Sequence, residues 1–332
     1  MYNQKTITKA FQDFNKMNVL IIGDVMIDAY MWGNVNRISP EAPVPIVAVN
    51  KKENRLGGAA HVALNIQAMG ATPILCSIVG DDMGGATFMD LLKQQQLSNQ
   101  GILKSKSRIT TIKTRVIGNN HQMLRVDEEI ETDISTKETK ALLIQIKKLI
   151  ESKKIDVIIF EDYDKGCITP ELIKEIVAFS KQKNIPTVVD PKKKNFMAYK
   201  GVTLLKPNLK ELKEGLKIDI DQNNTQELET ITQDFIKEQG IDTALITLSE
   251  KGVYIQNKKT KALVPAHIRT IADVSGAGDT VVSIAALCVA LNLSSVLTAT
   301  LANLAGGLVC ERIGVVPINK KQLLEEAILL RL

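Results

Sequence analysis

The chain has 332 residues, of which 45% are hydrophobic, enough to fill a sizeable core. Its 42 basic and 37 acidic residues leave a formal charge of +5 spread along the sequence, and aromatic residues make up only 4%. Nucleic-acid-binding proteins usually concentrate their basic residues and interleave aromatic ones. We therefore expect a globular protein that binds small molecules and has no nucleic-acid partner.

The four cysteines have no metal-ligand spacing, and the three histidines stand apart from one another. This pattern predicts neither a structural zinc site nor a disulfide framework. The N-terminal residues lack an apolar signal segment, and no apolar run reaches the roughly 20 residues that span a bilayer. We expect a cytoplasmic protein with no membrane partner.

In chain order, a polar leader with a helical pattern precedes a buried strand at 19–22, which ends at a glycine and an aspartate. Five further apolar runs repeat this design, at 71–82, 155–166, 185–194, 201–208 and 242–252. Helical patterns lie between them, so we predict an α/β fold with a mostly parallel sheet and helices on both faces. Ligands bind at the carboxyl ends of such strands, where the polar residues gather.

Two segments, 33–56 and 109–129, interrupt this alternation and predict β-ribbons, the second with a hairpin turn at 118–120. We expect them to form one small sheet that stands off the main body of a single domain covering 1–332. A mobile lid, a dimer contact and a lid that also dimerises remain open interpretations.

The segment "DVSGAGD" (273–279) places two glycines and an aspartate before an apolar helix. Helix N-termini expose unpaired N–H groups and glycines let a phosphate approach closely, so Gly276, Ala277 and Gly278 predict an anion hole. Asp279 could be a simple helix cap. The paired glycines and the second acid, Asp273, favour a base that takes the proton from an attacking hydroxyl.

"DVSGAGD" resembles the C-terminal signature of the ribokinase-like sugar kinases (the PfkB family), and "LGGAAHVALN" (56–65) is similar to their N-terminal Gly-Gly signature. The resemblance implies a ribokinase-like fold with a small β-sheet lid. It implies ATP and Mg²⁺ as cofactors, Asp279 as the catalytic base, and the amides of Gly276, Ala277 and Gly278 as the groups that hold the transferred phosphoryl group.

The resemblance also implies binding residues at matching positions. Asp28, Gly57, Gly58 and Asn65 would bind the sugar, and Asn208 and Glu211 in "KPNLKE" would organise Mg²⁺ through water. The nucleotide would contact Asn208, Thr247, Ser249, Gly252 and Asn303, and Asp273 with Ser275 would hold a monovalent cation such as K⁺.

Within the family, the chain is most similar to kinases that phosphorylate D-glycero-D-manno-heptose 7-phosphate at its anomeric oxygen. "RISPEAPVP" (37–45) and "DYDKG" (162–166) carry this similarity, which extends from about residue 19 to about residue 316. It implies a 1,7-bisphosphate product on the route to ADP-heptose and the lipopolysaccharide core, and a homodimer formed through the lid. Some heptose kinases carry a nucleotidyltransferase domain with an H-x-G-H motif; this sequence has none, so we expect adenylylation by another protein.

Glu161 and His61 depart from the pattern of these kinases. Both could face the sugar, although His61 could equally be a core or helix-surface residue. Asp162, Lys165 and Arg37 are further candidate sugar contacts. A phosphorylated substrate needs a cationic cradle, for which the candidates are Arg37, Lys165, Lys192, Lys193, Arg115 and Arg125. A kinase of another sugar or sugar phosphate, and a non-catalytic regulator, remain alternatives.

Overall fold

A nine-stranded sheet forms the centre of the computed structural model, which describes residues 4–221 and 224–330. Its order is β13-β12-β11-β10-β9-β8-β1-β4-β5. The strands from β5 to β11 run parallel, and β12 and β13 add an antiparallel edge. The parallel strands are β1 (Asn18–Gly23), β4 (Thr72–Gly80), β5 (Gly101–Ser105), β8 (Val157–Glu161), β9 (Thr187–Asp190), β10 (Leu204–Leu205) and β11 (Thr243–Thr247); the edge strands are β12 (Val253–Asn257) and β13 (Lys261–Val264). The predicted mostly parallel sheet is confirmed.

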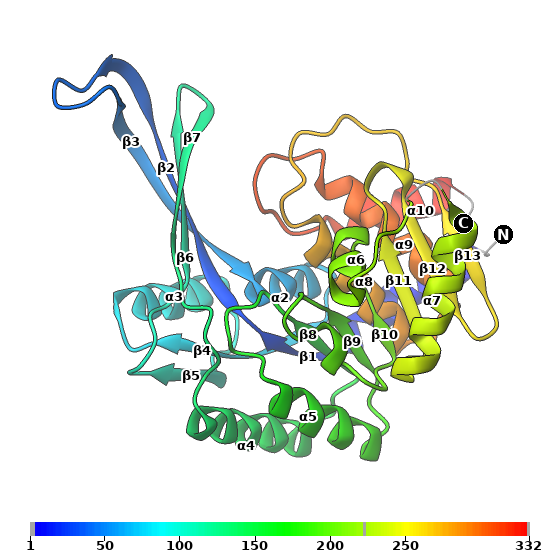
Figure 1. Ribbon diagram of the computed structural model, residues 1–332. Helices are drawn as coiled ribbons and strands as arrows, with labels where there is room; N and C mark the ends of the chain where they lie inside the picture. The colour runs from blue at the N-terminus through cyan, green and yellow to red at the C-terminus, as the bar shows by residue number, and fades with distance from the viewer. Residues whose placement is uncertain (1–3, 222–223, 331–332) are drawn as a thin grey trace.

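Helices cover both faces of this sheet (Figure 1). In β1, Val19 and Ile21 belong to one hydrophobic cluster and Leu20 and Ile22 to the other, which is why the strand is apolar throughout. One cluster includes residues of α1 (Gln4–Asp13), α2 (Ala59–Ala68), α3 (Met83–Gln94), α8 (Ala277–Ala290), α9 (Ser295–Val309) and α10 (Lys320–Leu329). The other includes residues of α4 (Thr136–Ser152), α5 (Pro170–Gln182), α6 (Leu209–Leu216) and α7 (Thr225–Gln239).

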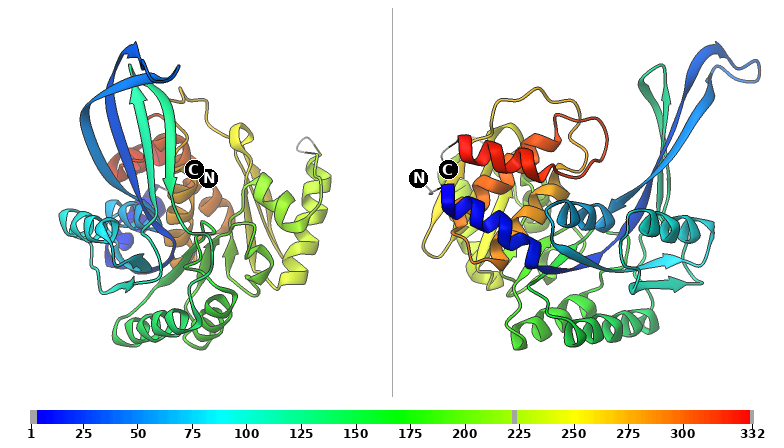
Figure 2. Two further views of the ribbon diagram at one scale, coloured as in Figure 1. Left: turned by 60° about the vertical axis from the view of Figure 1, so that its left-hand side comes forward. Right: turned by 180° about the vertical axis from the view of Figure 1, so that it is seen from behind.

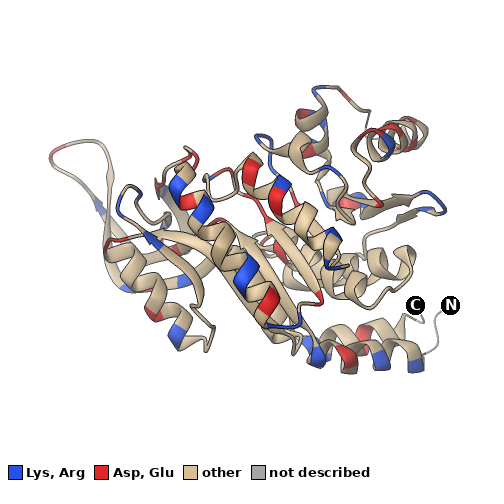
Figure 3. Cartoon of the chain, turned by 90° about the horizontal axis from the view of Figure 1, so that it is seen from below, with Lys and Arg blue, Asp and Glu red and all other residues tan. Residues whose placement is uncertain are grey.

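Basic and acidic residues are interspersed along the helices and loops in the cartoon of Figure 3. No helix among the described residues has the length and apolar character needed to cross a bilayer. The four cysteines are buried and unpaired.

A second, four-stranded sheet stands off the main body (Figures 1 and 2). It consists of β2 (Val25–Ile38), β3 (Pro45–Gly58), β6 (Ile112–Gly118) and β7 (His121–Glu128) in the order β3-β2-β6-β7. The predicted hairpin turn is present, with left-handed φ values of 50° at Asn119 and 66° at Asn120. The small sheet begins earlier than the predicted segment 33–56: β2 begins immediately after Asp24, so Asp28 already lies in this sheet.

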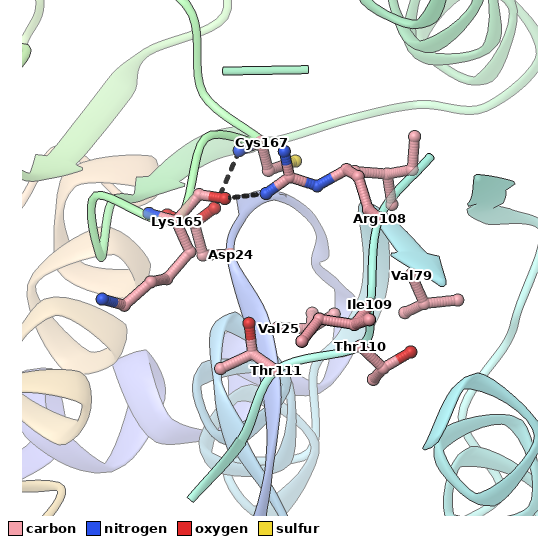
Figure 4. A pocket seen from close by; sticks show the side chains of 10 residues that line it. Asp24, Val25, Val79, Arg108, Ile109, Thr110, Thr111, Lys165 and Cys167 are labelled. Atoms are coloured by element: carbon pink, nitrogen blue, oxygen red, sulfur yellow. Dashed lines mark hydrogen bonds between the residues drawn. The ribbon is translucent and has the colours of Figure 1, made fainter. Parts of the chain in front are cut away.

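The residue between the two sheets, Asp24, is buried and holds the loop that follows β8. Its carboxylate accepts backbone N–H groups of Tyr163 (2.8 Å), Lys165 (3.1 Å) and Cys167 (2.9 Å). Burial raises the pKa of Asp24, although these hydrogen bonds oppose the rise. The adjoining cavity, also lined by Arg108, measures only 10 Å³, too little for a substrate (Figure 4). Asp24 therefore has a structural task, which is to fix the loop at 163–167.

Replacing Asp24 with Asn should destabilise the fold, because the amide NH₂ must face at least one of the three N–H donors. An unsatisfied buried donor costs about 1–3 kcal/mol, and we expect that loss in the free energy of unfolding measured by urea denaturation. Asp219→Asn is the matched control, since that side chain is 96% exposed. Equal stabilities of the two variants would contradict the structural task given to Asp24.

Candidate active site

Asp279 lies in the first turn of α8, where Gly276 is the N-cap residue in the left-handed conformation (φ 79°). The side chain of Asp279 is buried, and both carboxylate oxygens have partners. Oδ1 accepts the hydroxyl of Tyr163 at 2.7 Å, and Oδ2 lies 2.8 Å from Nδ1 of His61. Burial alone would raise the pKa of Asp279, but the hydrogen bonds from His61 and Tyr163 outweigh it and lower the pKa. Asp279 is thus a buried, ionised carboxylate and not the cap of its helix.

Two more acids lie beside Asp279, at the carboxyl ends of neighbouring strands. Glu161 ends β8, Asp190 ends β9, and single oxygens of the three carboxylates lie within 4.8 Å of one another. Burial and the neighbouring acids raise the pKa of Glu161 well above its ordinary value, and burial raises that of Asp190 to about 6 even though Lys206 lies 3.0 Å away. Oε2 of Glu161 and Oδ1 of Asp190 are buried without a hydrogen-bond partner. Such oxygens are suitable ligands for a hard cation.

The glycine loop lies next to this cluster. A Cβ atom on Gly278 would be 3.6 Å from Oδ2 of Asp190 and 3.8 Å from Nζ of Lys206. Burial alone would lower the pKa of Lys206, but Asp190 raises it, so the ammonium group stays charged. The N–H of Ala277 donates to the carbonyl of Val274 at 3.3 Å. A buried cation beside the N-terminus of a helix is suited to a phosphoryl group.

The residues expected to organise Mg²⁺ begin α6. Asn208 and Glu211 cap the helix reciprocally, with each side chain accepting the other's backbone N–H at 2.8 Å. The Glu211 carboxylate also pairs with Lys192. Asn208 adjoins Thr247 through an isolated β-bridge to the end of β11. The sequence motif therefore forms a helix cap at the same edge of the sheet as Asp190.

The remaining residues expected to contact the nucleotide meet around the loop at 264–266. Gly252 has a φ of 94°, and a Cβ atom there would be 2.1 Å from the carbonyl oxygen of Val264. Asn303 donates to the carbonyl of Pro265 at 2.8 Å. Ser249, with a φ of 52°, begins the short turn that leads to Gly252. The structure thus brings these residues together although they are far apart in sequence.

The pair expected to hold a monovalent cation has internal partners. Asp273 accepts the backbone N–H of Ser275 and of Gly314, each at 2.9 Å. Burial would raise the pKa of Asp273, but these bonds outweigh it and lower the pKa. Asp273 therefore joins the glycine loop to the segment after α9.

Several expected sugar contacts meet at the base of the small sheet. Asp28 is buried and pairs with Arg115 at 2.5 Å. A Cβ atom on Gly57 would lie 2.2 Å from Oδ2 of Asp28, and one on Gly58 (φ 59°) would lie 2.5 Å from the carbonyl oxygen of Asp24. Only glycine allows β3 to pass so near this carboxylate.

Other candidates lie elsewhere or are already engaged. Arg37 is exposed, nine residues along β2 from Asp28, which corresponds to about 30 Å of extended strand. Lys165 pairs with Glu129 (2.8 Å) and Glu131 (2.7 Å). Within one chain, Arg37 is therefore remote from Asp28, and Lys165 already has two carboxylate partners.

Three further candidates serve neighbouring segments. Asp162 accepts hydrogen bonds from Asn195 and Tyr199 and is buried. Arg125 pairs with Asp127. Lys193 lines a cavity of 660 Å³ that also contains Glu131, Asp164 and Glu214, so this cavity offers no uniformly cationic cradle.

Sequence reasoning gave no role to three residues of this site: Tyr163, Asp190 and Lys206. A signal existed for two of them, because Asp190 ends a buried strand and Lys206 precedes Pro-Asn directly after another. His61 was left open between core and sugar. The structure shows that it is buried and faces Asp279.

The fold and the site define a ribokinase-like phosphotransferase. The model of the pfkB family carbohydrate kinases matches residues 16–322, so the chain belongs to this family. It is a sugar kinase, and kinases of this family use ATP and Mg²⁺ to phosphorylate an alcohol group.

Curated relatives are similar over most of the chain, and solved structures share its fold. The bifunctional protein HldE of Caulobacter vibrioides is 39% identical over 91% of this chain and 61% of that protein, and that of Geobacter sulfurreducens is 33% identical over 96% and 65%. The chain thus spans less than two thirds of these relatives. Among solved structures, phosphofructokinase-2 from Escherichia coli in complex with potassium matches with a TM-score of 0.79 and 16% identity over 95% of this chain and 99% of that one. Arabidopsis thaliana ribokinase with ribose and ATP matches with a TM-score of 0.70, 14% identity, and coverage of 93% and 98%.

Proposed function

We propose that the protein transfers the γ-phosphoryl group of ATP to the anomeric hydroxyl of D-glycero-D-manno-heptose 7-phosphate. The observation that carries the chemistry is the ionised Asp279 beside the glycine loop and Lys206. The narrower substrate rests on the resemblance of "RISPEAPVP" and "DYDKG" to heptose kinases and on the match to the bifunctional HldE proteins. The product would enter the route to ADP-heptose and the lipopolysaccharide core.

In this proposal, Asp28 and the backbone at Gly57 orient the sugar at the base of the small sheet. Asp279 takes the proton of the attacking hydroxyl. The N–H groups of the glycine loop and the Lys206 ammonium stabilise negative charge on the transferred phosphoryl group. The small sheet acts as a lid that excludes water, which limits wasteful hydrolysis of ATP.

Magnesium fits the acidic cluster, because Glu161 and Asp190 offer buried oxygens without partners. These two residues would hold the ion, with Asn208 and Glu211 completing the site through water. The ion would supply positive charge to the phosphate oxygens of ATP. A monovalent cation such as K⁺ near Asp273 and Ser275 is part of the same proposal.

ADP release from ATP with a panel of sugars and sugar phosphates tests the function. We expect the highest kcat/KM with the heptose 7-phosphate, and a clear preference for fructose 6-phosphate or ribose would overturn the substrate assignment.

Asp279→Asn should lower kcat by about 10²- to 10⁴-fold, because the amide cannot accept the proton. ATP binding measured by calorimetry should stay close to wild type. A variant that keeps more than half the wild-type kcat would refute the base assignment.

Glu161→Gln should raise the Mg²⁺ concentration needed for the half-maximal rate, because a neutral amide is a poorer ligand for a hard cation. We expect about a tenfold increase, equivalent to about 1.4 kcal/mol. The exposed Glu175→Gln on α5 is the control variant. Identical Mg²⁺ titrations for the two variants would remove Glu161 from the metal site.

We also propose that two copies associate through their small sheets. Support comes from apolar side chains that are exposed at separate places on that sheet: Ile38 (70%), Val44 (51%) and Leu124 (58%). Apolar side chains exposed on a sheet that stands off the main body suit an interaction surface. In such a dimer, Arg37 of one copy would contact the sugar phosphate bound by the other copy, although it is far from the sugar site of its own chain.

Leu124→Glu should convert the dimer to a monomer in sedimentation velocity, because the interface would have to bury a charge. Ile144→Glu is the matched control, since Ile144 is 69% exposed on α4, outside the small sheet. A wild-type monomer, or equal behaviour of the two glutamate variants, would contradict the interface.

If Arg37 binds the sugar phosphate, Arg37→Ala should raise KM for the sugar phosphate by about 10-fold or more, with little change in KM for ATP.

A further inference from the structure

His61 occupies an unusual position for a helix histidine. It lies in the first turn of α2 with 1% of its side chain exposed, 218 residues from Asp279 in sequence, and its Nδ1 atom is 2.8 Å from Oδ2 of that carboxylate. The ring also supports the anion-hole loop, because a Cβ atom on Gly276 would be 2.7 Å from its Cε1 atom. His61 therefore contacts both the base and the start of the glycine loop.

The hydrogen bonds of Asn65 determine which ring nitrogen carries the proton. Oδ1 of Asn65 accepts the backbone N–H of Ile318 at 2.9 Å, and a backbone N–H can only donate. The Asn65 NH₂ group must then be the one that faces Nε2 of His61, at 3.4 Å. Because an NH₂ group only donates, Nε2 is the acceptor, and the proton of a neutral ring is on Nδ1. His61 thus donates to Asp279.

We propose that His61 is a positioning residue for phosphoryl transfer: its Nδ1–H, oriented by Asn65, fixes the carboxylate of Asp279 in the direction from which it takes the substrate proton. This inference rests on the proposed role of Asp279 as the base. Tyr163 holds the other oxygen, so the carboxylate has a donor on each side and cannot rotate without losing both. Hydrogen bonds of this kind fix the orientation of a reactive side chain.

The proposal predicts different kcat values for two substitutions of His61. Asn places its NH₂ nitrogen the same number of bonds from Cβ as Nδ1 of histidine, so it can keep the donor. Leu fills a similar volume against Gly276 but has no donor. We expect His61→Leu to lower kcat by about 10- to 100-fold, the scale of a misplaced catalytic group, with KM for both substrates nearly unchanged. His61→Asn should recover most of that loss.

Thermal unfolding of both variants separates positioning from folding. If His61 only filled space in the core, the kcat of each variant would fall with its thermal stability, and the Leu variant would be at least as active as the Asn variant. Equal kcat values for the Leu variant and wild type, or a Leu variant more active than the Asn variant, would overturn the proposal.

A second measurement does not depend on activity. The chain contains only three histidines, so ¹⁵N-histidine labelling gives three ring systems, and the one missing in His61→Asn is His61. We expect its ¹⁵N spectrum at neutral pH to show a proton on Nδ1, and an Nδ1 without a proton would overturn the hydrogen bond to Asp279. If the wild-type protein phosphorylated no sugar, the proposed function would fail, while this spectrum would still decide the hydrogen bond.

Discussion

At the carboxyl edge of the large sheet, one constraint decides the structure: several buried carboxyl groups need hydrogen-bond donors or positive charges as partners. These groups belong to Asp24, Glu161, Asp162, Asp190 and Asp279. Burying a carboxylate is costly unless hydrogen bonds or opposite charges replace its water. Asp24 meets this requirement with three backbone N–H groups, and Asp162 meets it with Asn195 and Tyr199. The loops after β8 and β9 are therefore held by these polar contacts as well as by apolar packing.

The acids of the site differ in how far this need for partners is met. Asp279 has a donor on each oxygen, and its pKa is lowered. Glu161 and Asp190 each keep a buried oxygen without a partner, and their pKa values are raised. A fold stabilised elsewhere by two large apolar clusters can tolerate this mismatch. Unmatched buried oxygens are what a cation-binding site requires before the cation arrives.

The parts of the structure that depend on local sequence were the predictable ones. Strand alternation, the "GNN" hairpin and the glycine loop before α8 follow from residues close together in the chain. Pairings across long separations do not, and the contact of His61 with Asp279 joins two helices with no shared pattern. The early start of the small sheet was missed for a different reason: apolar residues lie on both sides of Asp24, so the sequence does not reveal that one strand ends and another begins there.

Asp24 also connects the base of the small sheet to the carboxyl edge of the large sheet. Its backbone N–H donates to the carbonyl of Glu161 at 3.1 Å, and its carbonyl accepts the N–H of Ala59 at 2.9 Å, at the start of the helix that carries His61. Asp24 thus links the base of the small sheet to the loop that contains Tyr163 and to α2. Further along, β2 becomes progressively exposed and its pairing with β3 shifts register after Trp32. Because a bulge bends a strand and weakens the local ladder, the small sheet bends most easily beyond that point, and such bending leaves Asp28 and Asp279 in fixed relation to each other.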